Sequence, residues 1–141
     1  MFISHQAVPT WSEKFVSGGP PSARHYHTAI YAAAKDTMYV FGGKDGSRFN
    51  DVWALNLASD SWSAVTTSGG PPSARSAHTA VYAAARGTMY VFGGYDGSSR
   101  FNDVWALTLH EAFHAKLYSI EHRAPICNAF ALKGTGHTTG S

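Results

Sequence analysis

The 141-residue sequence predicts an all-β fold, and three observations support this prediction. First, residues 17–46 recur at residues 68–97, about 51 residues later, with few differences. Second, each copy breaks into short apolar runs separated by turn residues, the pattern of short strands. Third, each copy carries a Gly-Gly pair and spaced aromatic residues, which at this period is typical of repeat architectures. Six aligned pairs differ: 25/76, 26/77, 30/81, 35/86, 36/87 and 44/95.

The first copy contains four predicted strands. They are His27–Ala32, Thr37–Phe41, Asp51–Leu57 and Ser61–Val65. The second of them ends at Gly42-Gly43, where the missing Cβ lets another backbone or a ring approach closely. Their aromatic residues give a small sheet apolar area to bury against a neighbouring sheet.

The second copy contains three predicted strands before the repeat ends. They are His78–Ala83, Thr88–Phe92 and Asp103–Leu109. One extra residue, among Ser98 and Ser99, indicates an exposed loop, because such loops tolerate insertions. Upstream of both copies, residues 10–16 (TWSEKFV) align with residues 61–67 (SWSAVTT). They are therefore predicted to form a fourth strand that lacks its own first three.

Glycine and proline define the predicted connections. Gly-Gly-Pro-Pro precedes the first strand of each copy, and proline has no N–H to donate to a ladder. This segment must therefore connect one sheet to the next. Asp45-Gly46 and Asp96-Gly97 supply residues that accept a positive φ, which favours tight turns after the second strands.

The order PSAR…HTA…MYVFGG…FNDVWAL…W resembles the kelch repeat, one blade of a β-propeller, over roughly residues 11–109. The resemblance implies kelch-type blades, about two four-stranded equivalents, in an incomplete ring. Two blades cannot close a ring, and each would expose an aromatic face. Either the chain is part of a longer propeller, which we favour, or several chains assemble one. The residues that carry the motif are Gly42, Gly43, Trp53, Trp62, Gly93, Gly94 and Trp105.

The predicted organisation follows from the repeat. Residues 1–9 are an N-terminal extension, and residues 110–141 are a non-repeat tail. The kelch repeats cover residues 10–109. Within them we expect a lone fourth strand, a first blade and a second blade that lacks its fourth strand, at 10–16, 17–67 and 68–109.

Kelch propellers bind partners through loops at the faces of the ring, so the resemblance implies a non-catalytic module that binds a protein or peptide. The loops expected on one face are 17–24, 44–50, 68–75 and 95–102. Arginine suits carboxylates and tyrosine often anchors interfaces, which favours an acidic partner. The candidate partner-binding residues are Arg24, His25, Lys44, Arg48, Arg75, Tyr95 and Arg100.

A structural alternative competes for two of these candidates. Arg24 and Arg75 precede the first strand of each copy, and Asp51 and Asp103 precede the third. Each Arg–Asp pair would then brace its own blade, and we favour this reading. Lys44 and Tyr95 occupy equivalent positions yet differ in chemistry, which favours exposure and binding.

Composition narrows the remaining possibilities. A net charge of +2 does not indicate nucleic-acid binding, and no apolar run is long enough to span a membrane. The single cysteine, Cys127, excludes an intrachain disulfide and fits a reducing, cytoplasmic location. No cofactor is expected. His27 and His78 stand alone among small residues, so we expect structural histidines rather than metal ligands.

One motif points to catalysis. Residues 110–114 read HEAFH, which matches the H-E-x-x-H pattern of zinc hydrolases. The motif begins where the repeat ends, no recognised third ligand follows, and a histidine-rich chain produces such matches by chance. We therefore expect no enzyme and no metal site. A zinc hydrolase and a purely structural segment of a larger or oligomeric propeller remain the alternatives to a binding module.

Overall fold

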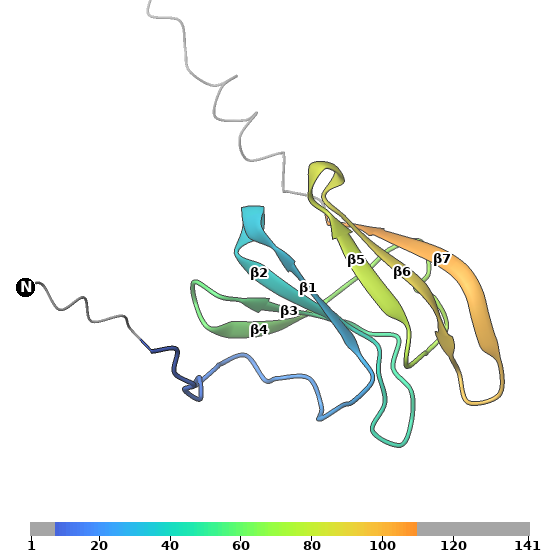
Figure 1. Cartoon of the computed structure of the whole chain (residues 1–141), viewed down its shortest axis with the longest axis horizontal. Helices are drawn as coiled ribbons and strands as arrows, with labels where there is room; N and C mark the ends of the chain where they lie inside the picture. The colour runs from blue at the N-terminus through green and yellow to red at the C-terminus, as the bar shows by residue number, and fades with distance from the viewer. Residues whose placement is uncertain (1–7, 110–141) are drawn as a thin grey trace, which may run out of the picture. The chain divides into compact units, whose positions relative to one another are not determined.

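A computed structural model describes residues 8–109, which form two antiparallel sheets (Figure 1). The first sheet has the strand order β1-β2-β3-β4, and the second has the order β5-β6-β7. The first-sheet strands are β1 (Thr28–Ala32), β2 (Thr37–Phe41), β3 (Val52–Asn56) and β4 (Ser61–Val65). The second-sheet strands are β5 (Thr79–Ala83), β6 (Thr88–Tyr95) and β7 (Arg100–Thr108). The predicted all-β, blade-like fold is confirmed.

Short 3-10 turns join the first two strands of each sheet. They are η1 (Ala33–Lys35) and η2 (Ala84–Arg86). Each ends on a residue in the left-handed region, Asp36 with φ 45° and Gly87 with φ 57°. This backbone requirement accounts for the residue types at one of the positions where the two copies differ, because glycine and aspartate both tolerate it. Among residues 8–109, no helix is long and apolar enough to cross a membrane.

The second sheet extends further than the sequence predicts. We expected its second strand to end at Phe92 and its third to begin at Asp103, but both strands continue towards the loop between them. A bulge between Phe92 and Gly94 restores the pairing, so that Gly94 faces Phe101 and Tyr95 faces Arg100. The extra loop residue leaves room for this longer hairpin. In the first sheet the equivalent pairing is a single bridge between Lys44 and Arg48.

The strand predicted over residues 10–16 is not formed. The segment has no ladder partner, and its Trp11 and Phe15 side chains are fully or almost fully exposed. It is attached to the first sheet by an exposed ion pair between Lys14 and Asp60, at 3.0 Å, and by the next residue, Ser17, which bridges Ser61 in parallel. An isolated strand leaves its backbone groups unpaired, so this segment needs the edge of a sheet beside it before it becomes one.

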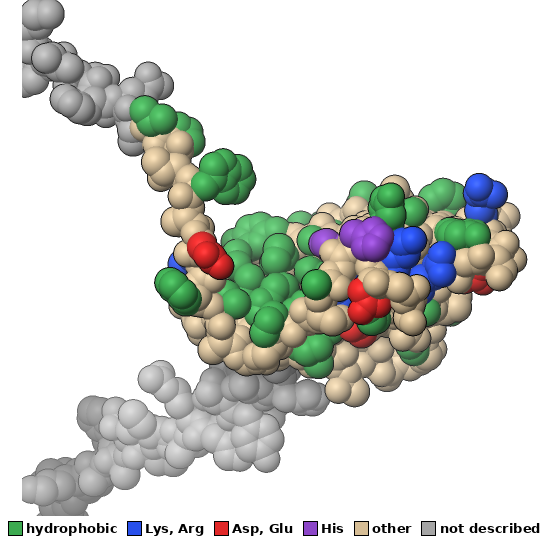
Figure 2. Space-filling view, turned by 90° about the horizontal axis from the view of Figure 1, so that it is seen from below, with side chains coloured by type: hydrophobic (Ala, Val, Ile, Leu, Met, Phe, Trp, Pro, Cys, Tyr) green, Lys and Arg blue, Asp and Glu red, His purple; other side chains and the backbone are tan. Residues whose placement is uncertain are grey.

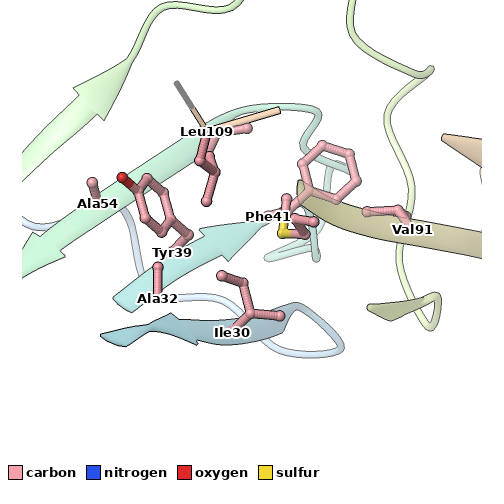
Figure 3. Close-up of a cluster of buried hydrophobic side chains, with 9 residues drawn as sticks. Ile30, Ala32, Tyr39, Phe41, Ala54, Val91 and Leu109 are labelled. Atoms are coloured by element: carbon pink, nitrogen blue, oxygen red, sulfur yellow. The ribbon is translucent and has the colours of Figure 1, made fainter. Parts of the chain in front are cut away.

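The hydrophobic core lies between the two sheets (Figure 3). Alternate residues of β1, β2 and β3 point to one face of the first sheet, where Ile30, Phe41 and Val52 are buried. Met89 and Val91 of β6 pack against them from the second sheet. Burying each of these side chains contributes about 1.5–3 kcal/mol. The contact between sheets therefore holds the described part of the chain together.

Candidate functional site

An Arg–Asp pair braces each sheet at the start of its first strand. Arg24 donates two hydrogen bonds to Asp51, at 2.7 and 3.0 Å, and one to the Gly42 carbonyl at 3.0 Å. Arg75 repeats the arrangement with Asp103 and the Gly93 carbonyl, at 2.7, 2.9 and 2.8 Å. The arginine side chains are only 5% and 1% exposed. This geometry matches the structural alternative, and both guanidinium groups are used within their own sheets.

The aspartates of these pairs are held as carboxylates. Hydrogen bonds from Arg75 lower the pKa of Asp103 to about 2, and the Trp105 indole N–H adds a bond of 2.7 Å. Burial alone would raise the pKa of Asp51, but hydrogen bonds from Arg24 and Trp53 outweigh it and lower the pKa. The two repeat tryptophans therefore act as hydrogen-bond donors as well as packing groups.

Phe49 and Phe101 complete these braces, and the sequence interpretation missed them. Each arginine guanidinium lies 4.3 Å from the centre of one of these rings, Arg24 over Phe49 and Arg75 over Phe101. A cation above an aromatic face is attracted to it, more strongly when both are withdrawn from water. The sequence does contain a signal for this contact, because in both repeats a phenylalanine lies two residues before the aspartate of the brace.

A histidine closes the seam between the sheets. The His78 ring is buried, its Nε2 lies 2.7 Å from the Thr28 hydroxyl, and its edge meets Phe41. Burial, helped by the charge of Arg75, lowers the pKa of His78 to about 4, so the ring is neutral near pH 7. The predicted structural role is confirmed for His78. His27, its counterpart in the first sheet, is exposed.

Backbone hydrogen bonds run alongside His78 across the seam. The Gly43 N–H donates to the Arg75 carbonyl at 2.9 Å, and the Arg75 N–H donates to the Phe49 carbonyl at 3.0 Å. This close approach accounts for Gly42, since a Cβ there would lie 2.8 Å from the Arg75 carbonyl oxygen, whereas a Cβ at Gly43 would lie 2.8 Å from the His27 Cβ of its own sheet. Glycine is needed at position 42 because the second sheet approaches so closely.

The other candidates gather where the β2–β3 and β6–β7 loops lie, at the end of the sheets seen in Figure 2. Lysine and arginine side chains lie there beside histidine (Figure 2). We call this region the loop-end surface. It consists of His25, Tyr26, Lys44, Arg48, Tyr95 and Arg100.

Tyr95 is the centre of the loop-end surface. The Arg48 guanidinium, from the first sheet, lies 4.9 Å from the centre of the Tyr95 ring, and Arg100 lies 5.9 Å from it. Arg48 Nε also donates to the Tyr95 carbonyl at 3.1 Å, so the two loops are tied together. Lys44 lies 5.6 Å from the Tyr26 ring in a second cation–aromatic contact.

Two aspartates shape the loops of this surface. Asp96 accepts hydrogen bonds from the backbone N–H groups of Ser98 and Ser99, at 2.8 and 2.6 Å, and these bonds lower its pKa. Asp45 accepts one from the Ser47 N–H at 3.2 Å. Among residues 8–109, Lys44, Arg48 and Arg100 form no salt bridge. The loop-end surface and its loops thus carry three cations, Lys44, Arg48 and Arg100, against two aspartates, Asp45 and Asp96, so this end of the sheets is positive.

The connecting loops lie differently from the prediction. We expected residues 17–24 to project from the same face as the β2–β3 loop. Instead, Ser17 exchanges backbone hydrogen bonds with Asp60 and Trp62 at the start of β4, the opposite end of the sheet. The chain reaches the loop-end surface only after this segment, where His25 exchanges backbone hydrogen bonds with Lys44. The spacing of the repeats in the sequence does not show that residues 17–24 run from one end of the first sheet to the other.

The catalytic alternative lies outside the described residues. The HEAFH motif covers residues 110–114, beyond the last residue whose structure is described. Within residues 8–109, no three histidine, cysteine, aspartate or glutamate side chains come together as metal ligands.

Comparison with known proteins gives consistent results. A family model described as the KLHDC2/KLHL20/DRC7 Kelch-repeats domain matches residues 2–131. The chain is 44% identical to human host cell factor 2 over 92 residues, covering 62% of this chain. It is 33% identical over 131 residues, or 86% of its length, to the Drosophila melanogaster leucine-zipper-like transcriptional regulator 1 homolog. It is 33% identical over 109 residues, or 74%, to the Xenopus laevis Rab9 effector protein with kelch motifs. The chain spans only 11%, 13% and 29% of these relatives.

Proposed function

Because this chain belongs to the KLHDC2/KLHL20/DRC7 Kelch-repeats family, we propose that it is a non-catalytic module that binds a protein or peptide through its loop-end surface. Kelch-repeat homologues are protein-interaction modules. One relative is named as an effector of Rab9, which is a description by partner rather than by reaction. The family thus supports the class of function, and the geometry of this chain supports the place.

The observation that carries the proposal is the Tyr95 cluster. Two arginines flank one tyrosine ring, and neither is in a salt bridge among the described residues. Tyrosine and arginine are, with tryptophan, the residues enriched among those that carry most of the binding energy at the centres of protein interfaces. An unpaired guanidinium also offers a fork of N–H donors that fits a carboxylate. A segment with Asp or Glu side chains is therefore the partner chemistry that this surface fits best.

Each repeat contains two arginines that have different roles. Arg24 and Arg75 are buried in the braces, so they hold the loops rather than contact a partner. Arg48 and Arg100 occupy equivalent positions in the β2–β3 and β6–β7 loops, one residue before the stacked phenylalanines. In each loop the brace is therefore the direct neighbour of an arginine that forms no salt bridge among the described residues, and a loop held in this way loses less entropy on binding.

A peptide library displayed on phage tests the proposal. We expect selection on the chain to enrich peptides rich in Asp and Glu. The double variant Tyr95→Ala, Arg100→Ala should bind the enriched peptides at least about tenfold more weakly, the equivalent of about 1.4 kcal/mol. Arg86→Ala, which removes an exposed cation at the opposite end of the second sheet, is the matched control. Enriched peptides that bind the double variant as well as the wild type would refute the loop-end surface.

A further inference from the structure

The second sheet has an exposed apolar face, which we call the open face. Val81, Phe92 and Val104 lie on it and are 64%, 53% and 66% exposed. Their counterparts in the first sheet, Ile30, Phe41 and Val52, are 7%, 2% and 5% exposed. The equivalent faces of the two sheets therefore differ, since this face is covered in the first sheet and uncovered in the second.

The contact inside the chain shows what covers such a face. The first sheet's apolar face is covered by β6 of the second sheet and sealed by His78, which enters between Thr28 and Phe41. In the open face the counterparts of these two residues, Thr79 and Phe92, line a shallow cleft with Gly93, Gly94 and Phe101, and Tyr95 and Arg100 of the loop-end surface line it too. This cleft corresponds to the place that His78 fills in the first sheet.

The surface that would match the open face lies on the first sheet, on the side turned away from the second sheet. His27 is the counterpart of His78, and it is exposed. Tyr31, the counterpart of the half-buried Tyr82, is 51% exposed. Upstream, residues 10–16 have the sequence of a fourth strand but pair with no strand of the described residues, while β7 forms an edge of the second sheet within those residues. One chain thus presents both complementary halves of its own internal contact.

We propose that the open face binds the first sheet of a second copy of this chain, head to tail. His27 of the incoming copy enters the cleft beside Thr79 and Phe92. Residues 10–16 of that copy add to β7 as its fourth strand. In the first sheet, β4 pairs with β3 so that Val65 lies opposite Val52 and Trp62 lies opposite Leu55. If residues 10–16 pair with β7 in the same register, Lys14 lies opposite Val104 and Trp11 lies opposite Leu107.

The occupant is a second copy because the interface already exists within the chain. The two repeats are nearly identical in sequence. The open face of the second sheet and the face of the first sheet that carries His27 and Tyr31 therefore keep the residue types that fit each other. The contact is heterologous, since each copy uses two different surfaces, and such contacts propagate until they close. Propellers of about four to eight blades would close with about two to four copies if each gives the two sheets of residues 8–109.

Light scattering coupled to size-exclusion chromatography tests the proposal on the 141-residue chain. We expect a closed assembly of the wild type at up to about 100 μM, a range in which micromolar self-association is populated. Val104→Lys on the open face and His27→Asp on the first sheet should each give monomers. Both residues are exposed, so both variants should still fold. Leu57→Lys, an apolar-to-charged change in the β3–β4 turn, should assemble like the wild type.

Mixing the two blocked variants separates head-to-tail from face-to-face association. The Val104→Lys copy keeps its first sheet intact, and the His27→Asp copy keeps its open face. Their mixture should therefore form a one-to-one heterodimer, with amides of β7 gaining protection from hydrogen exchange. A monomeric wild type, assembly of Val104→Lys, or no heterodimer in the mixture would each overturn the proposal. Neither Val104 nor His27 belongs to the loop-end surface, and no peptide is present, so these outcomes are read separately from those of the peptide experiment.

Discussion

At the scale of single residues, two buried cations decide the local structure. Arg24 and Arg75 each satisfy a carboxylate, a carbonyl from the Gly-Gly pair and an aromatic face at once. A buried guanidinium without a partner would be very costly, so the three ligands fix the start of the first strand relative to the second and third. The loops that carry Arg48 and Tyr95 are positioned by this brace.

Removing one carboxylate should show how much the brace contributes. We expect Asp103→Asn to lower the free energy of unfolding by about 2–3 kcal/mol, because it leaves the Arg75 charge buried with only an amide to accept from it. Lys14→Ala, which breaks the exposed ion pair with Asp60, should change it by less than about 1 kcal/mol. Urea denaturation of both variants measures the difference, and equal effects would contradict the brace.

His78 should make stability depend on pH. In the folded chain the pKa of His78 is about 4, below its ordinary value of 6.5. Between pH 4 and 6.5 the unfolded chain therefore binds a proton at this residue that the folded chain does not bind. Stability is therefore lost as pH falls from 6.5 towards 4, by on the order of 3 kcal/mol.

Two histidine variants isolate this effect. His78→Gln should flatten the fall in stability between pH 6.5 and 4, whereas His25→Gln, at an exposed position, should keep it. Thermal unfolding at closely spaced pH values gives the comparison. A wild-type slope that persists in His78→Gln would assign it to other groups.

At the scale of elements, the two hairpins that carry the Gly-Gly pairs differ in what lies against them. Gly42 and Gly93 have φ of 61° and 66°, so alanine is strained at both. A Cβ at Gly42 would also lie 2.8 Å from the Arg75 carbonyl oxygen of the other sheet. A Cβ at Gly93 would lie 3.1 Å from the Phe101 carbonyl oxygen of its own sheet. The seam therefore makes a stricter demand on the first hairpin.

Alanine at these two glycines should have unequal costs. Gly93→Ala should lose about 1–2 kcal/mol of stability from backbone strain alone. Gly42→Ala should lose about 1 kcal/mol more, because the seam must open to admit the methyl group. Chemical denaturation under monomeric conditions measures both losses. A larger loss for Gly93→Ala would mean that the seam is not as close as described.

The strands were predictable because two copies of the repeat confirm each other's boundaries. The Arg–Asp braces were also predictable, since both partners recur at fixed spacing. The contact of Arg48 with Tyr95 was not, because it joins different sheets and requires knowledge of how they stack. The missing strand at residues 10–16 shows another limit, since sequence gives the propensity of a strand but not the presence of its neighbour.

At the scale of the whole described chain, the two proposed functions use adjoining surfaces, because Tyr95 and Arg100 of the loop-end surface also line the cleft beside the open face. The loop-end surface is charged and aromatic, whereas the open face is apolar and continues the packing that joins the sheets. Assembly through the open face would place several loop-end surfaces side by side on one ring. A partner with repeated acidic segments would then bind more tightly through effective concentration, without any new kind of contact.

Hydrogen exchange with a selected acidic peptide tests the central claim, that this chain binds partners at its loop-end surface. Exchange is measured by mass spectrometry with and without the peptide, and the Tyr95→Ala, Arg100→Ala variant serves as the control. We expect slower exchange in residues 24–26, 44–50 and 95–100, and no change in the variant. Protection confined to η1, η2 or the β3–β4 turn, at the opposite end of the sheets, would contradict the account.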